Sequence, residues 1–422
     1  MKSTLLTTTA LVMLASTSAV YADGHTGISF VGNANVGFND DDGEFGEDGF
    51  FWDADIDVTM SAALDNGVTA AVNFELDIVD DENSETISSD EFVLSVTTEN
   101  AGFFFGDTEF AAETLWVSAG DMEADGFSEA DGENVIRGDV SVAGFDLSLS
   151  YVVTHALGTD AGDNGVVNAN FNPDGVAAGL VTATADFQDN DEFVDQLSLG
   201  IAGDIGMFSL SAAYQEESVS AGISAAAAGL TGDEITSLVA AGLYAPGVAN
   251  GDFTENQIFG VSGGVSLAGA DITLAYAQKT GFDGADDESS TGIQVAYPFG
   301  PVTVTAYYVS EDDNDSDEDN LGINVAFADG PISVTADYDD DQGTDKWSLE
   351  GSYDLGNGLT VLAGVLNEDE EEEDFYVAGE FDLGGGAELL VSFAEDESGD
   401  QEDEVGAPEY LPGTTVEVSF SF

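Results

Sequence analysis

Several residue types are absent or scarce in this 422-residue chain, and each shortage excludes a kind of protein. Cysteine is absent, which excludes disulfide frameworks, thiolate metal sites and a cysteine nucleophile. The only histidines are His25 and His155, too few for a histidine metal cage. Four Lys and Arg stand against 85 Asp and Glu, and the resulting net charge of −81 repels phosphate backbones. Nucleic acid is therefore excluded as a partner.

Long apolar runs are also missing beyond the first segment. Nothing after residue 22 approaches the roughly 18 uninterrupted apolar residues of a membrane-spanning helix. Residues 1–22 contain a Lys, then a short apolar run without acids, and Val20 and Ala22 stand where a signal peptidase requires small residues. We therefore expect residues 1–22 to be a cleaved export signal and residues 23–422 to form one exported domain.

The most informative pattern present is an alternation with a period of two. From Trp52 the chain reads WDADIDVTMS, which places apolar residues on one face of a strand and Asp, Thr and Ser on the other. The sequence Asp-Asn-Gly at residues 65–67 is a strong hairpin-turn signal. The next run, from Val68 to Ile78, alternates again, with Ile78 on the apolar face. These segments predict a hairpin with one apolar and one acidic face.

The hairpin pattern recurs along the chain, with short turns alternating with longer acidic connections. Nine hairpins, with a first strand near Ile28–Phe38 and a last strand at Val416–Phe422, bring the pattern count to 20 strands. The further segments are Phe92–Val96, Phe103–Phe105, Val135–Val142, Phe145–Val153, Leu197–Ile201, Phe208–Tyr214, Ile258–Leu267, Ile272–Tyr276, Ile293–Tyr297, Val302–Tyr308, Ile323–Phe327, Ile332–Tyr338, Trp347–Leu355, Leu359–Val365, Phe375–Leu383 and Leu389–Phe393.

Two architectures can use such hairpins. A soluble secreted acidic β protein would bury the apolar face between two sheets. A membrane barrel needs short turns at one end, long loops at the other, and an apolar face nearly free of carboxylates, since a charge facing lipid at mid-depth costs about 2 to 4 kcal/mol. The apolar register here carries no carboxylate, and aromatic residues such as Trp52 and Trp347 stand near strand ends. The pattern favours an all-β, closed antiparallel transmembrane β-barrel, and the sandwich remains the alternative.

Three segments make the chain resemble the bacterial outer-membrane porins, in particular those of alphaproteobacteria. They are MKSTLLTTTALVML at the start, GFFFGDTEFAAETLW at residues 102–116, and the terminal VEVSFSF. The resemblance implies a barrel of about 16 to 18 strands, usually a homotrimer, so the expected range is 16 to 20. It also implies the outer membrane of a Gram-negative bacterium and a passive diffusion channel for small hydrophilic solutes and ions. No cofactor is expected.

The resemblance further implies that the third external loop folds into the lumen and narrows it. By position this loop matches residues 106 to about 132. Such constrictions usually oppose loop carboxylates with a basic cluster, but beyond residue 22 this chain has only Arg137, Lys279 and Lys346. Arg137 shares a register with Asp139 and is either the wall partner of the loop or an ordinary lumen salt bridge. The expected constriction residues are Asp107, Glu109, Glu113, Asp121, Glu123 and Asp125.

A water-filled lumen lined by carboxylates concentrates cations and excludes anions. We therefore expect a cation-preferring channel, and a substrate-specific outer-membrane channel is the alternative. The expected lumen-wall residues are Arg137, Asp53, Asp55, Asp57, Glu75, Asp77, Asp139 and Asp146.

The aromatic end of the last strand is similar to the signal that the outer-membrane assembly machinery reads. The resemblance assigns that role to Val418, Phe420 and Phe422, which also suit an ordinary lipid-facing strand end.

Acidic runs at residues 38–49, 311–319 and 367–374 have two interpretations. Such runs are more often solvated outer faces, but carboxylates can also bridge magnesium or calcium to the phosphates of lipopolysaccharide in the outer-membrane lipid. The spacing from Asp313 begins like a calcium loop, yet Glu318 stands where glycine is required. We therefore predict no metal site.

Two local features do not change this interpretation. Thr231 and Glu234 form a capping box that predicts a helix up to Leu243. His155 lies near Asp160 at a strand end, but the chain has no G-x-S-x-G motif, so we predict no enzymatic activity.

Overall fold

The computed structural model describes residues 26–40, 49–64, 67–80, 88–127, 134–153, 194–217, 256–280, 287–312, 319–368, 373–395, 405–407 and 409–422. Residues 1–22, the centres of the three acidic runs, the helix expected at residues 231–243, and His155 lie outside these ranges.

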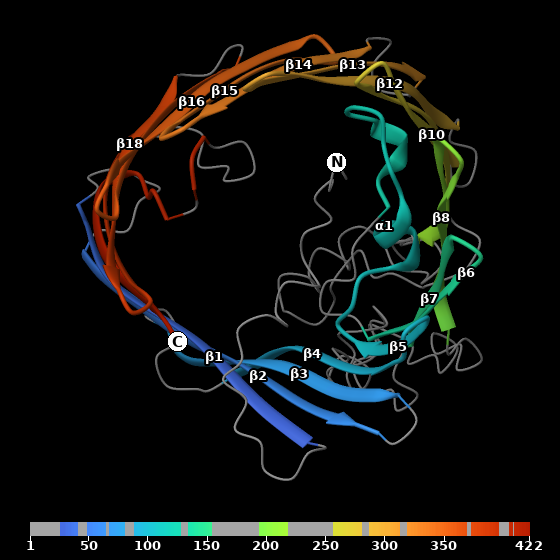
Figure 1. The fold of residues 1–422 in the computed structure, drawn as a ribbon, viewed down its shortest axis with the longest axis horizontal. Helices are drawn as coiled ribbons and strands as arrows, with labels where there is room; N and C mark the ends of the chain where they lie inside the picture. Colours follow the sequence, from blue (N-terminus) through green and yellow to red (C-terminus); the bar gives the residue numbers. More distant parts are fainter. Residues whose placement is uncertain are drawn as a thin grey trace, which may run out of the picture.

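The described residues form a closed antiparallel β-barrel of 20 strands, which confirms the predicted fold and the pattern count (Figure 1). Each strand pairs with the next, and β20 pairs with β1 to close the ring. No helix in the described ranges is long and apolar enough to cross a membrane. The elements are β1 (Thr26–Asp40), β2 (Gly49–Ala63), β3 (Thr69–Asp80), β4 (Ser88–Thr97), β5 (Ala101–Gly106), α1 (Ala111–Leu115), the 3-10 helix η1 (Glu123–Asp125), β6 (Val135–Val142), β7 (Phe145–Val153), β8 (Val194–Ile205), β9 (Phe208–Glu217), β10 (Asn256–Leu267), β11 (Ala270–Thr280), β12 (Glu288–Phe299), β13 (Val302–Asp312), β14 (Asn320–Asp329), β15 (Ile332–Asp341), β16 (Thr344–Gly356), β17 (Leu359–Glu368), β18 (Asp374–Gly384), β19 (Ala387–Glu395) and β20 (Gly413–Ser421).

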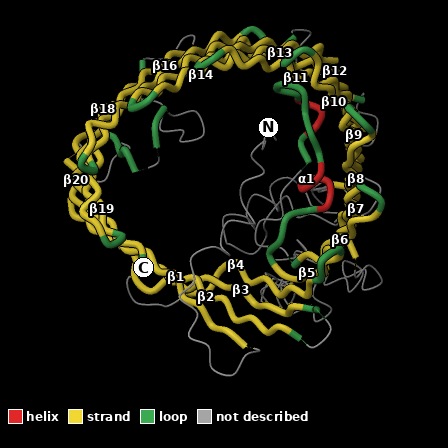
Figure 2. Tube along the Cα trace, in the orientation of Figure 1, coloured by secondary structure: helices red, strands yellow, loops and turns green. Residues whose placement is uncertain are grey.

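The loop that follows β5 lies inside the ring and identifies the inner face of the wall (Figure 2). Its backbone hydrogen-bonds to Ser150 of β7 and Ser198 of β8, so the register of these serines faces the lumen. Their chain neighbours Leu149 and Leu199 point the other way and are exposed. The alternation read from the sequence thus separates an inner from an outer face.

The outer face is apolar, as the alternation predicts. In the β1–β2 pair, Val36 lies opposite Trp52, and Phe30 lies opposite Val58. Phe30 is 65% exposed. Apolar exposure on this scale is unusual for a soluble monomer but is what a lipid-facing band requires. The exposed aromatic residues predicted near strand ends are Trp52, Tyr276, Tyr297, Tyr308, Tyr338, Trp347 and Tyr353.

A β-bulge in the β2–β3 pair changes the predicted place of Ile78. Ala54 lies opposite Val79, whereas the next residue, Asp55, lies opposite Asp77. Ile78 is therefore the extra residue of the bulge. Val79, 37% exposed, takes the outward place that the simple alternation assigned to Ile78.

A tight turn at Gln342 and Gly343 joins β15 to β16, where the pattern predicted a longer acidic connection. Both residues have positive φ, 47° and 89°, as a type I′ turn requires. The Gln342 N–H donates to the Asn320 side chain and the Gly343 N–H to the Asp340 carboxylate, each at 3.0 Å. These hydrogen bonds satisfy the turn locally, so no long loop is needed here.

A second segment, residues 405–407 and 409–412, also lies inside the ring and leads into β20 (Figure 1). Tyr410 is buried against Tyr376 of β18, with ring centroids 4.8 Å apart. Pro412 forms an isolated bridge with Ala394 of β19. The sequence pattern did not predict this inward segment, which we call the 405–412 segment.

Candidate functional site

The loop inside the barrel begins at Gly106, where β5 ends. Gly106 has a φ of 124°, and a Cβ at this position would overlap the backbone carbonyl of Phe92. The N–H of Asp107 donates to that same carbonyl at 2.9 Å. Glycine is thus required where the chain leaves the wall and turns into the lumen.

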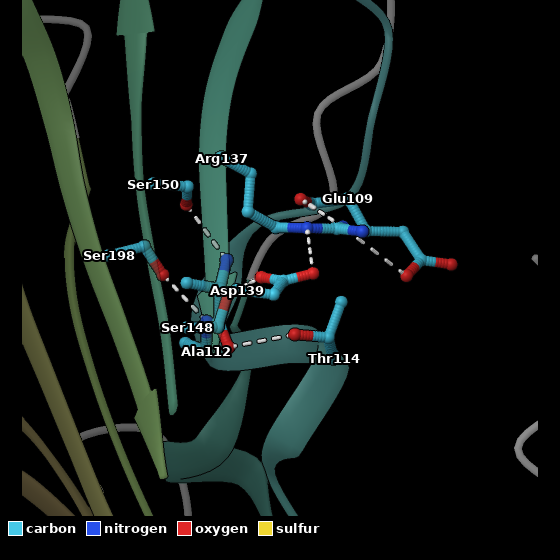
Figure 3. Close-up of polar contacts among 9 residues, drawn as sticks. Glu109, Ala112, Thr114, Arg137, Asp139, Ser148, Ser150 and Ser198 are labelled. Carbon is cyan, nitrogen blue, oxygen red and sulfur yellow. Dashed lines mark hydrogen bonds and ion pairs between the residues drawn. The ribbon is translucent and has the colours of Figure 1, made fainter. Parts of the chain in front are cut away.

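Serine hydroxyls of the wall hold the first half of the loop. Ser150 Oγ accepts a hydrogen bond from the Ala111 N–H, and Ser198 Oγ accepts one from the Ala112 N–H, both at 2.8 Å (Figure 3). These are first-turn amides of α1, which have no carbonyl partner within a helix. The start of α1 is therefore satisfied by β7 and β8.

Polar side chains of β12, β13 and β14 hold the second half. Ser290 Oγ accepts from the Ala124 N–H at 2.9 Å, and Gln294 Oε1 accepts from the Gly120 N–H at 3.2 Å. Asn320 Nδ2 donates to a loop carbonyl, that of Asp121, at 3.2 Å, and Glu311 Oε1 of β13 accepts from the Glu123 N–H at 3.4 Å. Side chains of β7, β8, β12, β13 and β14 thus hold the loop along its path.

Glycines on the inner register allow the loop to lie directly on the wall. A Cβ on Gly200 would overlap the backbone of α1, and a Cβ on Gly292 would overlap the carbonyl oxygen of Ala119. A Cβ on Gly260 would lie 2.5 Å from Cζ3 of Trp116. Sequence reasoning missed these positions, although three glycines on the inner register of neighbouring hairpins were the available signal.

Apolar side chains fill the space between the loop and the wall. Phe110 is fully buried with Val135 and Val152. Trp116 packs on Phe127, with ring centroids 5.4 Å apart. The other buried residues of this contact are Ala119, Met122, Ala124, Ala275, Ala277 and Val309. Because the loop has its own apolar contacts, it is a packed part of the barrel.

The Arg137 side chain fastens the first part of the loop to the wall (Figure 3). Its Nη1 donates to the Glu109 carbonyl at 2.9 Å and lies 3.8 Å from the Glu109 carboxylate, and its Nε lies 3.4 Å from the Asp139 carboxylate. The guanidinium also lies 4.7 Å from the centre of the Phe104 ring. The side chain is only 8% exposed, so its positive charge is matched by carboxylates and withdrawn from the open lumen.

Asp121 and Glu123 are exposed on the loop, and with Asp341 of β15 they form a group whose carboxylate oxygens lie within 4.8 Å of one another. Partial desolvation raises the pKa of Asp121, and the negative charges of Asp341 and Asp339 raise it further. Exposed acidic groups of this kind are common on protein surfaces without a bound metal ion. The group is suited to attracting mobile cations.

Asp125 is more enclosed than its neighbours. Burial raises its pKa to about 6, the Trp116 Nε1–H that donates to it at 2.8 Å lowers the value, and the charge of Asp121 raises it. Asp125 therefore gains or loses its proton near neutral pH. The remaining predicted loop carboxylates, Asp107, Glu109 and Glu113, are partly buried in the first half of the loop.

The predicted wall acids of β2 and β3 lie opposite one another on the inner register. Asp55 faces Asp77, and Asp57 faces Glu75 across the strand pair. Directly opposed like charges destabilise a sheet, so this face requires water or cations between the side chains. Asp53 continues the row toward the start of β2.

The other predicted wall acids lie beside Arg137. Asp139 accepts a hydrogen bond from the Ser148 hydroxyl at 2.6 Å, and Asp146 accepts one from Ser141. The two acids share the inner face of β6 and β7 with Arg137.

The last residues of the chain complete the ring on its outer side. Val418 and Phe420 belong to the outward register of β20, opposite Val36 and Ala34 of β1. Phe422 is 74% exposed, and its backbone exchanges two hydrogen bonds with Gly32, at 2.8 and 2.9 Å.

Comparisons with known proteins found similar solved structures and one family model. A multiple mutant of the Rhodopseudomonas blastica porin is 16% identical, with a TM-score of 0.40, and the match covers 94% of this chain and 100% of that one. A triple mutant of the same porin is also 16% identical, with a TM-score of 0.38 and the same coverage. No curated protein matches. A family model described as Gram-negative porin matches residues 7–241 and 220–401, well over half of the chain. The protein therefore belongs to the Gram-negative porin family.

Proposed function

We propose that this protein, an outer-membrane diffusion channel for small solutes and ions by its family and fold, admits cations in preference to anions. The observation that carries the proposal is the charge balance of the inner face. Its carboxylates greatly outnumber its bases, and the three bases beyond residue 22 lie beside acids. Arg137 contacts two carboxylates, Lys346 Nζ lies 3.6 Å from Glu368, and Lys279 lies opposite Glu288 in the β11–β12 pair. Little positive charge is left to attract anions.

The physical reason for the preference is the low dielectric constant of the barrel wall and the lipid around it. Field lines from wall carboxylates are confined to the water in the lumen, which raises the local concentration of cations. The loop from Asp107 to Phe127 narrows the lumen, and its exposed carboxylates Asp121 and Glu123 stand where a permeating ion passes close to protein. We assign these residues to the selective constriction.

The reversal potential of the purified protein in a planar bilayer under a potassium chloride gradient tests the proposal. Its sign should be that of a potassium-permeable pore, and the preference should weaken as salt screens the wall charges. Neutralising Asp121 and Glu123 together should lower the cation-to-anion ratio about fourfold at about 0.15 M salt. A unit charge about 8 Å away in water contributes about 0.5 kcal/mol, screening over one Debye length lowers this to about 0.2 kcal/mol, and both charges act with opposite sign on the cation and the anion.

The control is Glu99→Gln, which removes one exposed charge at the turn between β4 and β5. It should leave the ratio unchanged. Anion preference in the unmodified channel would contradict the proposal. If Glu99→Gln lowers the cation-to-anion ratio as much as the double loop variant does, Asp121 and Glu123 have no special part in the selectivity.

The proposal extends to delivery and assembly. Residues 1–22 serve as the export signal, Val418, Phe420 and Phe422 serve as the signal for the assembly machinery, and the working unit is a homotrimer. What supports the two signals is the composition of the first segment and the outward aromatic end of β20, and the homotrimer rests on the resemblance to porins. The mass of the exported chain tests cleavage after residue 22, and the mass of the detergent-solubilised complex tests the homotrimer.

A further inference from the structure

We infer that a cavity beside the 405–412 segment binds small aliphatic amines as they pass through the pore. This inference rests on the proposed channel function and adds a class of solute to it. The cavity has a volume of about 380 Å³, within the range of about 300 to 1,000 Å³ typical of small-molecule sites. It lies on the inner face between β2, β1, β20 and β19, across the barrel from α1 (Figure 1).

The lining of this cavity is acidic and contains no base. Asn33 and Ser419 supply neutral polar groups. The carboxylates of the lining are Asp53, Asp55, Asp382, Glu388, Glu409 and Glu417. A solute that enters meets hydrogen-bond acceptors of negative charge on several sides.

Glu417 is the residue that indicates a ligand. It belongs to the inner register of β20, opposite Leu390 and Gly37, and is only 6% exposed. Within the described ranges, no hydrogen bond or ion pair reaches its carboxylate, and its charged neighbours are Glu409 and Glu388. An ionised carboxylate in such a position is unfavourable without a counter-charge, so Glu417, which lines the cavity, takes up either a proton or a cation from the lumen. The experiment below distinguishes the two.

The 405–412 segment holds the cavity open in a fixed shape. The Tyr410 hydroxyl donates to Glu380 Oε1, and Asn39 Nδ2 donates to the Pro412 carbonyl at 2.8 Å. These contacts fasten the chain between Glu409 and Glu417 to β18 and β1. A site held in this way loses little conformational entropy when a ligand binds.

The arrangement fits an ammonium group better than a metal ion. In the part of the chain that the structure describes, the one group of three acids within 4.8 Å is Asp121, Glu123 and Asp341, on the opposite side of the lumen. The cavity carboxylates are spread around its walls, which does not suit the compact oxygen shell of magnesium or calcium. An alkylammonium donates three hydrogen bonds in different directions, and a diamine reaches two carboxylates at once.

Calorimetric titration of the detergent-solubilised full-length protein with diaminobutane tests the inference, together with block of potassium current by the same amine. Glu417→Gln, which keeps the shape of the side chain, should weaken diaminobutane binding about tenfold or more, because hydrogen bonds to charged groups are among the stronger ones. Glu388→Gln, at the exposed edge of the cavity, should weaken it less. The matched control is Asp271→Asn on the inner register of β11, outside the cavity, and it should bind as the unmodified protein does.

Two results would overturn the inference. In the first, both glutamine variants bind diaminobutane as the unmodified protein does, which would mean that Glu417 is neutralised by a proton. In the second, magnesium alone binds with higher affinity than the amine and loses that affinity in Glu417→Gln, which would make the cavity a metal site. Calorimetry needs no conductance, so it is independent of the reversal potential that tests the channel proposal. A cation-preferring channel without this amine site would leave the proposed function intact.

Discussion

Gly292→Ala is the sharpest perturbation of the loop contact, because it adds one methyl group where the loop touches β12. The new Cβ would overlap the carbonyl oxygen of Ala119 and lie 3.2 Å from Ala119 Cβ. Restoring ordinary contact distances moves this part of the loop about 1 Å from the wall. The Gly120 N–H hydrogen bond to Gln294, at 3.2 Å, and the Ala124 N–H bond to Ser290 are then lost or stretched.

The magnitude follows from these contacts. Two neutral hydrogen bonds contribute about 1 kcal/mol each, and overpacking costs about 1 to 3 kcal/mol. The docked position of the loop should therefore lose about 3 to 5 kcal/mol, a factor of about 100 or more in its population. The displaced loop moves toward the lumen, so we expect a lower single-channel conductance with added flicker.

Single-channel recording of the purified variant in a planar bilayer is the assay. Gly126→Ala is the matched control, since it adds the same methyl group in the same loop, where a Cβ meets nothing within 4 Å. Gly126 has φ of −60° and ψ of 68°, an inverse γ-turn conformation that does not require glycine. If Gly292→Ala has the same single-channel conductance and the same low flicker as Gly126→Ala, the loop does not rest on Gly292, and the reasoning is refuted.

Two further predictions concern charges on the loop. Burial raises the pKa of Asp125 to about 6, although its hydrogen bond from Trp116 acts in the opposite direction. Lowering the pH from 7 to 5 should therefore protonate Asp125 and reduce the cation preference. The reversal potential should show a step near pH 6, and Asp125→Asn should abolish this step. Because the folded protein binds this proton more tightly than the unfolded chain, the contribution of Asp125 to the free energy of unfolding falls as the pH rises from about 4 to 6. Urea melts of Asp125→Asn that keep this pH dependence would contradict the assignment. Arg137→Met should lower the free energy of unfolding by about 2 kcal/mol, because it removes the charged hydrogen bond to the Glu109 carbonyl and the weaker ion pairs with the Glu109 and Asp139 carboxylates, which are 39% and 36% exposed. Unchanged thermal stability in detergent would contradict this role of Arg137.

Much of the wall was predictable from the sequence. Strands have a side-chain period of two, so the run from Trp52 to Met60 assigns each residue to one face without knowledge of its partners. Turn residues are equally local: Asn357-Gly358 has positive φ at both positions, as its sequence suggests. The count of 20 strands followed from these two signals.

Other features of the wall depend on pairing between strands. The bulge at Ile78 is visible only in the pairing of β2 with β3, where Ala54 lies opposite Val79 and Asp55 lies opposite Asp77. The short turn at Gln342-Gly343 has no strong hairpin signal of its own, and its geometry is supported by Asn320 on the neighbouring strand β14.

Except at the Ile78 bulge, the amino-acid sequence by itself determined which side chains face outward, which face the lumen, and that the lumen is acidic, because strand alternation and net charge are local or additive properties. Only the tertiary structure decided where the loop lies on the wall, that Arg137 is enclosed by carboxylates, and that Glu417 is buried beside the 405–412 segment. Those features depend on contacts between residues far apart in the chain, such as Ala124 with Ser290 and Asn39 with Pro412. Closure of the ring brings these residues together, and no periodicity along one strand encodes which of them will meet.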